Sequence, residues 1–418
     1  MASRSQVSPA RRAAFAVLQR VFEDGAFADR ALRSESAALD DRDRALAQQL
    51  AYGSVQRART LDHAIETLGR RPVRKLDPPV RAALRLGCYQ LAFLDGVPRY
   101  AAVNESVELV RKARLERAVP FTNAVLRRLA DGARELCESL PEGTPEEAAL
   151  RHSYPDWVAE TWWRELGADE ARALMRAQNA EPETAVRLVR GAVDGSEDPL
   201  IPGAWVVERV DEKAVAEGRV WPQSRGSQLV GHTVGSLPGE RTLDLCAAPG
   251  GKATMLAGEV VAVEVDEARS ERLEKTVRRL GASDVRVVHA DGRELPPELD
   301  GFDRALVDAP CSGLGVLASR PDLRWRAESL PELQLELLRA AIGRVRPGGA
   351  VIYSTCTINA EENEAVVDAV VGEGLVSTDP KLGDEWPAFR HRSRPELLQT
   401  LPHVHGTGGF FVARLVVR

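Results

Sequence analysis

One stretch of the sequence decides the fold of the C-terminal half: Arg241-Thr-Leu-Asp-Leu-Cys-Ala-Ala-Pro-Gly-Gly-Lys252. Residues 241–246 read as a short apolar strand, which runs into a turn of small residues and then into a helix predicted over residues 251–258. Further strands are predicted at residues 260–265, 285–289, 302–308, 350–355 and 410–417, with helices at 266–280 and 330–345. This alternation predicts an α/β fold, a parallel and doubly wound sheet with helices on both faces.

The turn after the first strand allows a ligand to approach the backbone closely. Ligands of open α/β sheets bind beyond the carboxyl ends of the strands, where this turn falls. The turn has neither the Walker A pattern nor the strict GxGxxG pattern of dinucleotide-binding proteins. Small side chains leave room, and helix N–H groups would face the ligand. The candidate binding residues are Cys246, Ala247, Ala248, Pro249, Gly250, Gly251 and Lys252.

Acidic residues follow the next two strands at the same edge of the sheet. Glu264 ends the second strand and Asp266 comes two residues later, where an acid can accept hydrogen bonds from both ribose hydroxyls. Asp291 follows the third strand and is a candidate for an adenine amino group. Glu264 or Asp291 alone is equally well explained as a helix N-cap or a solvated loop residue. Together with the turn, they favour a cationic adenosine ligand, and S-adenosylmethionine fits that description.

Two thiols and a carboxylate end the fourth and fifth strands. Asp308 and Cys311 follow one strand and Cys356 follows the next, so both thiols are expected at the same rim. A thiolate added to C6 of a pyrimidine makes C5 nucleophilic enough to attack an electrophilic methyl group. Asp308, protonated or sharing a proton, would stabilise the charge on the ring through N3. The pattern therefore favours covalent methyl transfer to C5.

The N-terminal part of the chain is predicted to be helical, because residues 9 to about 134 show helical periodicity with few glycines. The 418-residue chain has a net charge of −6, yet residues 1–140 carry +7 and the remainder carries −13. Its basic residues cluster at Arg70, Arg71, Arg74 and Lys75, at Arg111, Lys112, Arg114 and Arg117, and at Arg127 and Arg128. Scattered basic residues usually mark solvated helix faces, but this charge split favours an RNA partner.

The chain is divided into three predicted domains: a helical domain over 1–139, a small α+β linker module over 140–234 and the α/β domain over 235–418. Strands are expected in the module at 185–190 and 205–210.

No run of apolar residues is long enough to span a membrane, and the polar, basic start does not resemble a signal peptide. The five cysteines form no CxxC pair, so neither disulfides nor a metal site is favoured, and a reducing cytoplasm is expected. We interpret Cys88, Cys137 and Cys246 as packing residues.

These motifs resemble the signatures of RNA cytosine-C5 methyltransferases. The resemblance is carried by residues 243–252, 308–312 and 354–357, and by Arg320-Pro-Asp322 with Trp325, Gly348-Gly349 and Glu361-Glu-Asn363. Residues 11–21, 101–110 and 121–128 look like a NusB-type RNA-binding helical domain. Their combination is typical of the Sun/RsmB (Fmu) family of small-subunit rRNA methyltransferases, whose catalytic domain has a Rossmann-like class I fold.

The resemblance implies a role for each matching residue. Residues 246–252 with Glu264, Asp291 and Asp308 would hold S-adenosylmethionine. Cys356 would be the nucleophile, Cys311 would assist release of the enzyme, and Lys252 would lie near the active site. The substrate would be an unstacked cytosine in 16S rRNA, and a monomer is expected. Glu264 stands where the family usually has Asp, which lengthens the ribose-binding arm by one methylene.

Two alternatives stay open at the level of the sequence. The first is a cytosine-C5 methyltransferase that acts on tRNA or another RNA. The second is an RNA-binding assembly factor with a vestigial methyltransferase domain. The second is disfavoured because both cysteines, Asp308 and the glycine turn are all present.

Overall fold

The computed structural model describes residues 7–418 and divides into two compact units. One comprises Met1–Asn179 with Leu317–Arg326, and the other comprises Ala180–Val316 with Ala327–Arg418. Residues 1–6, which belong to the polar start discussed above, lie outside the described residues. No helix in the described part of the chain is long and apolar enough to cross a membrane. The three predicted domain boundaries stay a prediction.

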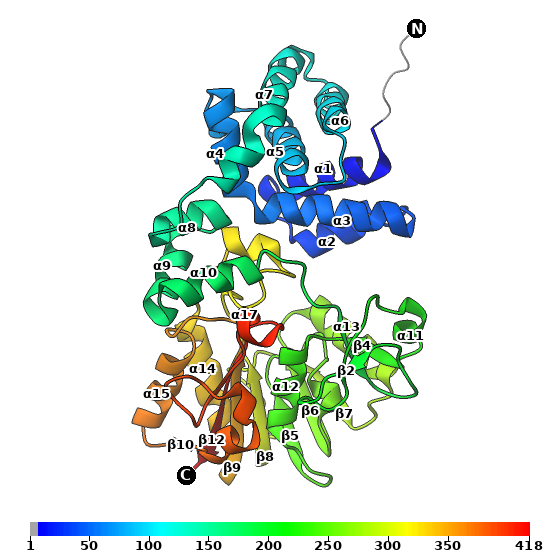
Figure 1. The fold of residues 1–418 in the computed structure, drawn as a ribbon. Helices are drawn as coiled ribbons and strands as arrows, with labels where there is room; N and C mark the ends of the chain where they lie inside the picture. Colours follow the sequence, from blue (N-terminus) through cyan, green and yellow to red (C-terminus); the bar gives the residue numbers. More distant parts are fainter. Residues whose placement is uncertain (1–6) are drawn as a thin grey trace. The chain divides into compact units, whose positions relative to one another are not determined.

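The first unit is helical throughout, as predicted, and its core surrounds a central helix (Figure 1). Its helices are α1 (Pro9–Phe22), α2 (Ala28–Glu35), α3 (Asp41–Gln56), α4 (Ala58–Gly69), α5 (Pro78–Phe93), α6 (Arg99–Lys112), α7 (Val119–Glu138), α8 (Pro145–His152), α9 (Asp156–Leu166) and α10 (Ala168–Ala177), with the 3₁₀ turns η1 (Val73–Lys75), η2 (Glu116–Ala118) and η4 (Pro321–Trp325).

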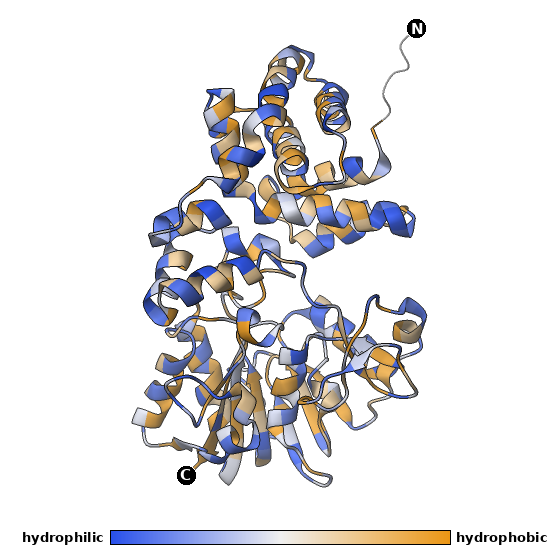
Figure 2. Ribbon diagram, viewed as in Figure 1, coloured by the Kyte–Doolittle hydropathy of each residue, from blue (hydrophilic) through white to orange (hydrophobic). Residues whose placement is uncertain are grey.

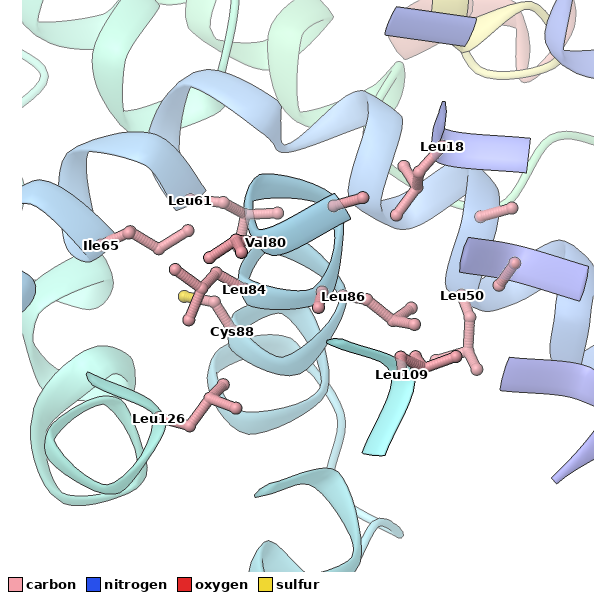
Figure 3. Packing of buried hydrophobic residues seen from close by; sticks show 14 of the residues in the cluster. Leu18, Leu50, Leu61, Ile65, Val80, Leu84, Leu86, Cys88, Leu109 and Leu126 are labelled. Carbon is pink, nitrogen blue, oxygen red and sulfur yellow. The ribbon is translucent and has the colours of Figure 1, made fainter. Parts of the chain in front are cut away.

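Helix α5 is apolar on more than one side, so it can pack against several neighbours at once. Figure 3 shows Leu84 and Cys88 of α5 beside Leu61 of α4, with Leu126 of α7 below them. Gly87 allows α7 to approach closely, because a Cβ there would lie 2.4 Å from Leu126 Cδ2. The helical periodicity of the sequence thus becomes a core shared by α1 to α7.

The second unit is built on a twisted sheet with the strand order β10-β12-β9-β8-β5-β6-β7. Its strands are β5 (Arg241–Asp244), β6 (Glu259–Glu264), β7 (Val285–His289), β8 (Phe302–Asp308), β9 (Val345–Thr355), β10 (Val376–Thr378), β11 (Leu398–Gln399) and β12 (Phe411–Val417). Its helices and 3₁₀ turns are α11 (Glu212–Ala216), α12 (Arg225–Val234), η3 (Ala253–Met255), α13 (Glu267–Leu280), α14 (Pro331–Ile342), α15 (Glu364–Gly372), α16 (Lys381–Glu385), η5 (Pro387–Phe389) and α17 (Pro402–His405).

Helices cover both faces of this sheet, as the alternation predicted. Ala305 and Val307 of β8 share a buried cluster with α14 and α15, whereas Leu306, which points to the other face, packs with α12. The strands are accordingly hydrophobic along most of their length in Figure 2, while the helices carry polar stripes. Within the sheet, β5, β6, β8 and β9 are parallel neighbours, so their carboxyl ends share one edge.

Two details of the predicted α/β domain are wrong. β12 pairs antiparallel with β9 and β10, so the sheet is mixed and not parallel throughout. The chain enters β12 at the carboxyl edge of the sheet instead of crossing back to the amino edge, and β12 therefore runs in the opposite direction. The helix predicted over 251–258 is only the 3₁₀ turn η3, because Leu256 is already extended and Gly258, at φ +76°, leads directly into β6.

A small antiparallel sheet precedes the main one in the same unit. Its order is β2-β3-β1-β4, formed by β1 (Ala185–Leu188), β2 (Ser196–Glu197), β3 (Ala204–Val206) and β4 (Val220–Pro222). The two strands predicted in this region correspond to β1 and β3. Arg187 of β1 is largely buried and donates to the backbone oxygen of Thr254 at 3.1 Å, which ties the small sheet to the segment after the glycine turn.

Candidate active site

The small-residue turn leaves β5 at the carboxyl edge and is tied to both neighbouring strands. Leu245 N–H donates to Leu306 of β8, and Ala247 N–H donates to Val263 of β6, each at 3.0 Å. Gly250 has φ +101°, and a Cβ there would lie 2.8 Å from Leu273 Cδ1 of α13. Only glycine satisfies both conditions, so the turn keeps its backbone close to the edge of the sheet.

The acidic residues that follow β6 have distinct roles. Glu264 is 2% exposed; its Oε1 accepts from Asp266 N–H at 3.0 Å, and its Oε2 lies 3.1 Å from Arg269 Nη2. Asp266 is the N-cap of α13 and accepts from Arg269 N–H at 2.7 Å. Glu264 is therefore neither a helix N-cap nor a solvated loop residue, but a buried carboxylate at the edge where ligands bind.

Asp291 is more exposed than Glu264 and Asp308, the other acidic residues predicted to bind the cofactor. Its half-exposed carboxylate binds the guanidinium of Arg293, with Oδ2 at 2.7 Å from Nη2, and Arg293 also contacts Glu336 at 2.9 Å. The hydrogen bonds from Arg293 lower the pKa of Asp291. A ligand at this position would have to share the carboxylate with Arg293.

Asp244, the last residue of β5, is a candidate that the sequence reasoning missed. It is 1% exposed, and within residues 7–418 no group forms a hydrogen bond of good geometry with either carboxylate oxygen. Burial, followed by the nearby charge of Asp308, raises the pKa of Asp244 to about 7. The position of Asp244 at the carboxyl end of β5, directly before the small-residue turn, was the available signal. A buried carboxylate whose pKa is raised in this way fits a site for a cationic group.

The two thiols meet at the rim, as predicted. β8 and β9 are parallel neighbours with Asp308 opposite Ser354, and the Sγ atoms of Cys311 and Cys356 are 3.4 Å apart. The hydrogen bond with Cys356 and burial raise the pKa of Cys311 well above its ordinary value. Cys311 therefore stays a protonated thiol at neutral pH, next to the second sulfur.

Lys252 and Asp308 form an ion pair beside the thiols. The Nζ–Oδ2 distance is 2.6 Å, and Ser354 Oγ donates to the other oxygen, Oδ1, at 2.8 Å. Lys252 Nζ also lies 5.6 Å from the centre of the Phe410 ring. The structure thus brings together Lys252, Asp308, Cys311 and Cys356, with the glycine turn on the same edge of the sheet.

The remaining cysteines lie in packed surroundings. Cys88 and Cys137 are buried in the helical core, and burial raises the pKa of Cys137 to about 11. Cys246 packs against the core between the sheet and α14, and burial raises its pKa as well. These three thiols are poor nucleophiles at neutral pH.

In the helical unit, the exposed basic clusters converge on α7. All ten clustered Lys and Arg residues named above are exposed. Arg71 lies 5.5 Å from the ring centre of Phe121 on α7, and Arg128 donates to the backbone oxygen of Leu68 at 2.9 Å, beside the loop that carries Arg70. The third cluster, residues 111–117, leads directly into α7. The clusters are therefore neighbours in space.

Comparison with known proteins agrees with this architecture. The family model described as 16S rRNA methyltransferase RsmB/F matches residues 233–416, and the NusB family model matches residues 8–131. The probable ribosomal RNA small subunit methyltransferase B of Synechocystis is 33% identical, covering 97% of this chain and 99% of the relative. The Thermus thermophilus protein of that name is 37% identical, with 86% of each chain covered. Fold and edge motifs thus define a methyltransferase with a NusB-type domain. The chain belongs to the RsmB/F family of 16S rRNA methyltransferases, as its motifs predicted.

Solved structures show the same fold. The crystal structure of PH0851 superimposes with a TM-score of 0.82 at 24% identity, covering 99% of this chain and all of that one. NSun6 from Pyrococcus horikoshii superimposes with a TM-score of 0.54 at 22% identity, covering 64% of this chain and 99% of that one.

Proposed function

We propose that the protein transfers a methyl group from S-adenosylmethionine to C5 of a cytosine in 16S rRNA, through a covalent bond between Cys356 and C6. The observation that carries the proposal is the pair of thiols at 3.4 Å, with the Lys252–Asp308 ion pair beside them at the edge that holds the glycine turn. A SAM site alone would need neither thiol.

The buried carboxylates fit the proposed cofactor. Asp244 and Glu264 surround a turn of small residues with negative charge, which suits a sulfonium or ammonium group, and Glu264 suits a ribose. When bound, S-adenosylmethionine supplies the electrophilic methyl group. NSun6 from Pyrococcus horikoshii was solved with SFG, an analogue of S-adenosylmethionine, which supports a cofactor of this type for the shared fold.

The chain's own residues then account for the chemistry on the base. The Cys356 thiolate forms the S–C6 bond, and the C5–C6 π electrons move to C5 and the ring. The Lys252–Asp308 ion pair, whose charged atoms are 2.6 Å apart, would lie at N3 and stabilise the charge that develops there. After methylation, C5 loses its proton and β-elimination returns the electrons of the S–C6 bond to Cys356. Cys311, next to the departing sulfur, assists this release.

The helical unit supports RNA as the substrate. Phosphates would be held by the exposed clusters around α7, with an affinity that falls as salt rises. The target cytosine must leave its stack to meet Cys356, so a loop or a splayed single strand is proposed. The names of the relatives favour the small-subunit rRNA over tRNA. We propose that the protein acts as a monomer in the cytoplasm, where rRNA is made and thiols stay reduced.

The test compares Cys356→Ala with the unchanged protein. The variant should lose methylation of 16S rRNA by more than about a thousandfold, the scale for loss of a nucleophile. Calorimetric binding of S-adenosylmethionine should stay within about twofold. Bisulfite sequencing of rRNA and tRNA from cells with and without the protein identifies the RNA. Undiminished turnover of Cys356→Ala would refute the mechanism, and a new mark in tRNA alone would refute the substrate.

A further inference from the structure

A further buried carboxylate lies beside the loops that carry the two thiols and has no role assigned above. Glu362 precedes α15 and is fully buried. Its Oε1 accepts hydrogen bonds from Ser312 N–H at 3.0 Å, Leu330 N–H at 3.2 Å and Gln334 Nε2 at 2.9 Å. Its Oε2 accepts from Ser312 Oγ and from Asn359 Nδ2. All these donors are neutral, and together they occupy both oxygens.

These contacts join the two cysteine loops. Ser312 directly follows Cys311 and donates two hydrogen bonds to Glu362, through its amide and its hydroxyl. The Ser312 hydroxyl also lies 2.7 Å from Thr357 Oγ1, the residue after Cys356. One carboxylate therefore anchors the residue next to the first thiol and, through one hydroxyl, the residue next to the second.

The loop that carries Glu362 is itself held rigidly against β9. Thr355 Oγ1 donates to Asn363 Oδ1 at 2.6 Å, and Asn363 Nδ2 donates to the backbone oxygen of Thr357 at 3.1 Å. The hydroxyl of Tyr353 donates to the backbone oxygen of Glu362 at 2.5 Å. Because the loop cannot shift freely, the position of the Glu362 carboxylate is transmitted to Ser312.

We propose that Glu362 is a positioning residue for the methyl transfer, one that holds the Cys311 and Cys356 loops at the separation required for release of the enzyme from RNA. The inference rests on the proposed function of the thiols. The Glu362 charge also contributes to raising the pKa of Cys311, after the larger effects of Cys356 and burial, which favours the protonated thiol of Cys311. Without the hydrogen bonds between Glu362 and Ser312, Cys311 would move away from the Cys356 sulfur that must leave C6, and the covalent adduct would persist.

The chain offers a matched control in the neighbouring residue. Glu361 carries the same side chain in the same motif, but it is exposed. Glu362→Ala removes the hydrogen bonds to Ser312. Glu362→Gln keeps the shape of the side chain without its charge, and Glu361→Gln makes the same isosteric change at an exposed position. In Glu362→Gln, the amide oxygen can still accept from the three N–H groups, and Ser312 can turn its proton toward Thr357.

The experiment measures steady-state methylation of 16S rRNA, and the fraction of protein covalently bound to RNA on denaturing gels. Glu362→Ala should lose about 100-fold in kcat with KM for RNA within about twofold, and should accumulate adduct. Glu362→Gln should recover most of that loss, to about tenfold below the unchanged protein. Glu361→Gln should match the unchanged protein. If Glu362→Ala does not fold, Glu362→Gln decides the question alone.

Equal kcat and equal adduct in Glu362→Gln and Glu361→Gln, or a loss confined to KM, would overturn the inference. Cys356→Ala, run in the same assay, separates this failure from that of the proposed function. If Cys356→Ala still turns over, the mechanism fails whatever Glu362 does. If Cys356→Ala is inactive and Glu362→Gln equals its control, only the role of Glu362 fails.

Discussion

Each unit of the molecule buries a charged side chain among neutral partners, but with opposite sign. In the helical unit, the guanidinium of Arg324 is 1% exposed, stacks 4.0 Å from the Tyr154 ring centre and donates to Gln178 O at 2.8 Å and Asn179 Oδ1 at 2.7 Å, among other oxygens. In the second unit, which contains the mixed sheet, Glu362 is enclosed by N–H and O–H donors. Both charges are stabilised by fixed dipoles, and each ties together segments far apart in the sequence.

Asp244 differs from both, because its buried oxygens have no hydrogen bond of good geometry among the described residues. The comparison teaches that the buried charges of Arg324 and Glu362 serve the fold, because several fixed dipoles face each of them, whereas Asp244, at the edge of the sheet where ligands bind, is suited to a ligand. The first two predictions below test that distinction and the next two test the thiols and the basic surface, from the largest expected effect to the smallest.

Asp244→Asn should stabilise the cofactor-free protein at neutral pH. The native pKa of Asp244, about 7, lies above its unfolded value, so its contribution to stability is complete at low pH and is lost as pH rises from about 4 to 7. That loss is on the order of 4 kcal/mol in the unfolding free energy. Urea unfolding at pH 4 and pH 8 should give a stability difference between variant and unchanged protein that grows with pH. A pH-independent difference would contradict the assignment.

Arg324→Met should act in the opposite direction. It leaves several buried oxygens without donors, so unfolding should become easier by about 3 kcal/mol. Thermal unfolding followed by circular dichroism measures the effect, with Arg127→Met as the exposed control on α7. Equal melting temperatures of the two variants would show that the oxygens around Arg324 contribute nothing to stability.

Cys311→Ala should slow release while leaving the nucleophile in place. We expect multiple-turnover methylation to fall roughly 100-fold, the typical contribution of a positioned proton-transfer group. A slowly migrating protein–RNA band should appear on denaturing gels. Rapid turnover with no such band would separate Cys311 from release and weaken the reason for tying its loop to Glu362.

The exposed charges should matter for RNA and not for stability. Replacing Arg127 and Arg128 together by Ala removes two charges from the α7 surface, which should lower the slope of log affinity against log salt by about 1 to 2. Filter binding of 16S rRNA fragments between low and physiological salt measures it. An unchanged slope would show that RNA binds elsewhere.

Much of the site was predictable because its residues sit at strand ends. The carboxyl ends of neighbouring parallel strands share an edge, so short motifs after β5, β8 and β9 predicted that Lys252, Asp308, Cys311 and Cys356 would meet. Asp291 was less predictable, since no local pattern indicated that Arg293 would occupy its carboxylate. Asp244 was missed within the quoted stretch, because its position at a strand end does not show by itself that its carboxylate is buried.

The sequence by itself determined the helical periodicity of the first unit, the strand and helix alternation of the second, and the motifs at the carboxyl edge. These depend on spacing along the chain, where side-chain direction follows the backbone repeat. The tertiary structure alone decided that residues 317–326, which lie between two edge motifs, pack within the helical unit around Arg324. It also decided the antiparallel course of β12 and the reach of Glu362 to Ser312. Such contacts join distant segments, and their energy depends on which dipoles surround a buried charge, which no local pattern records.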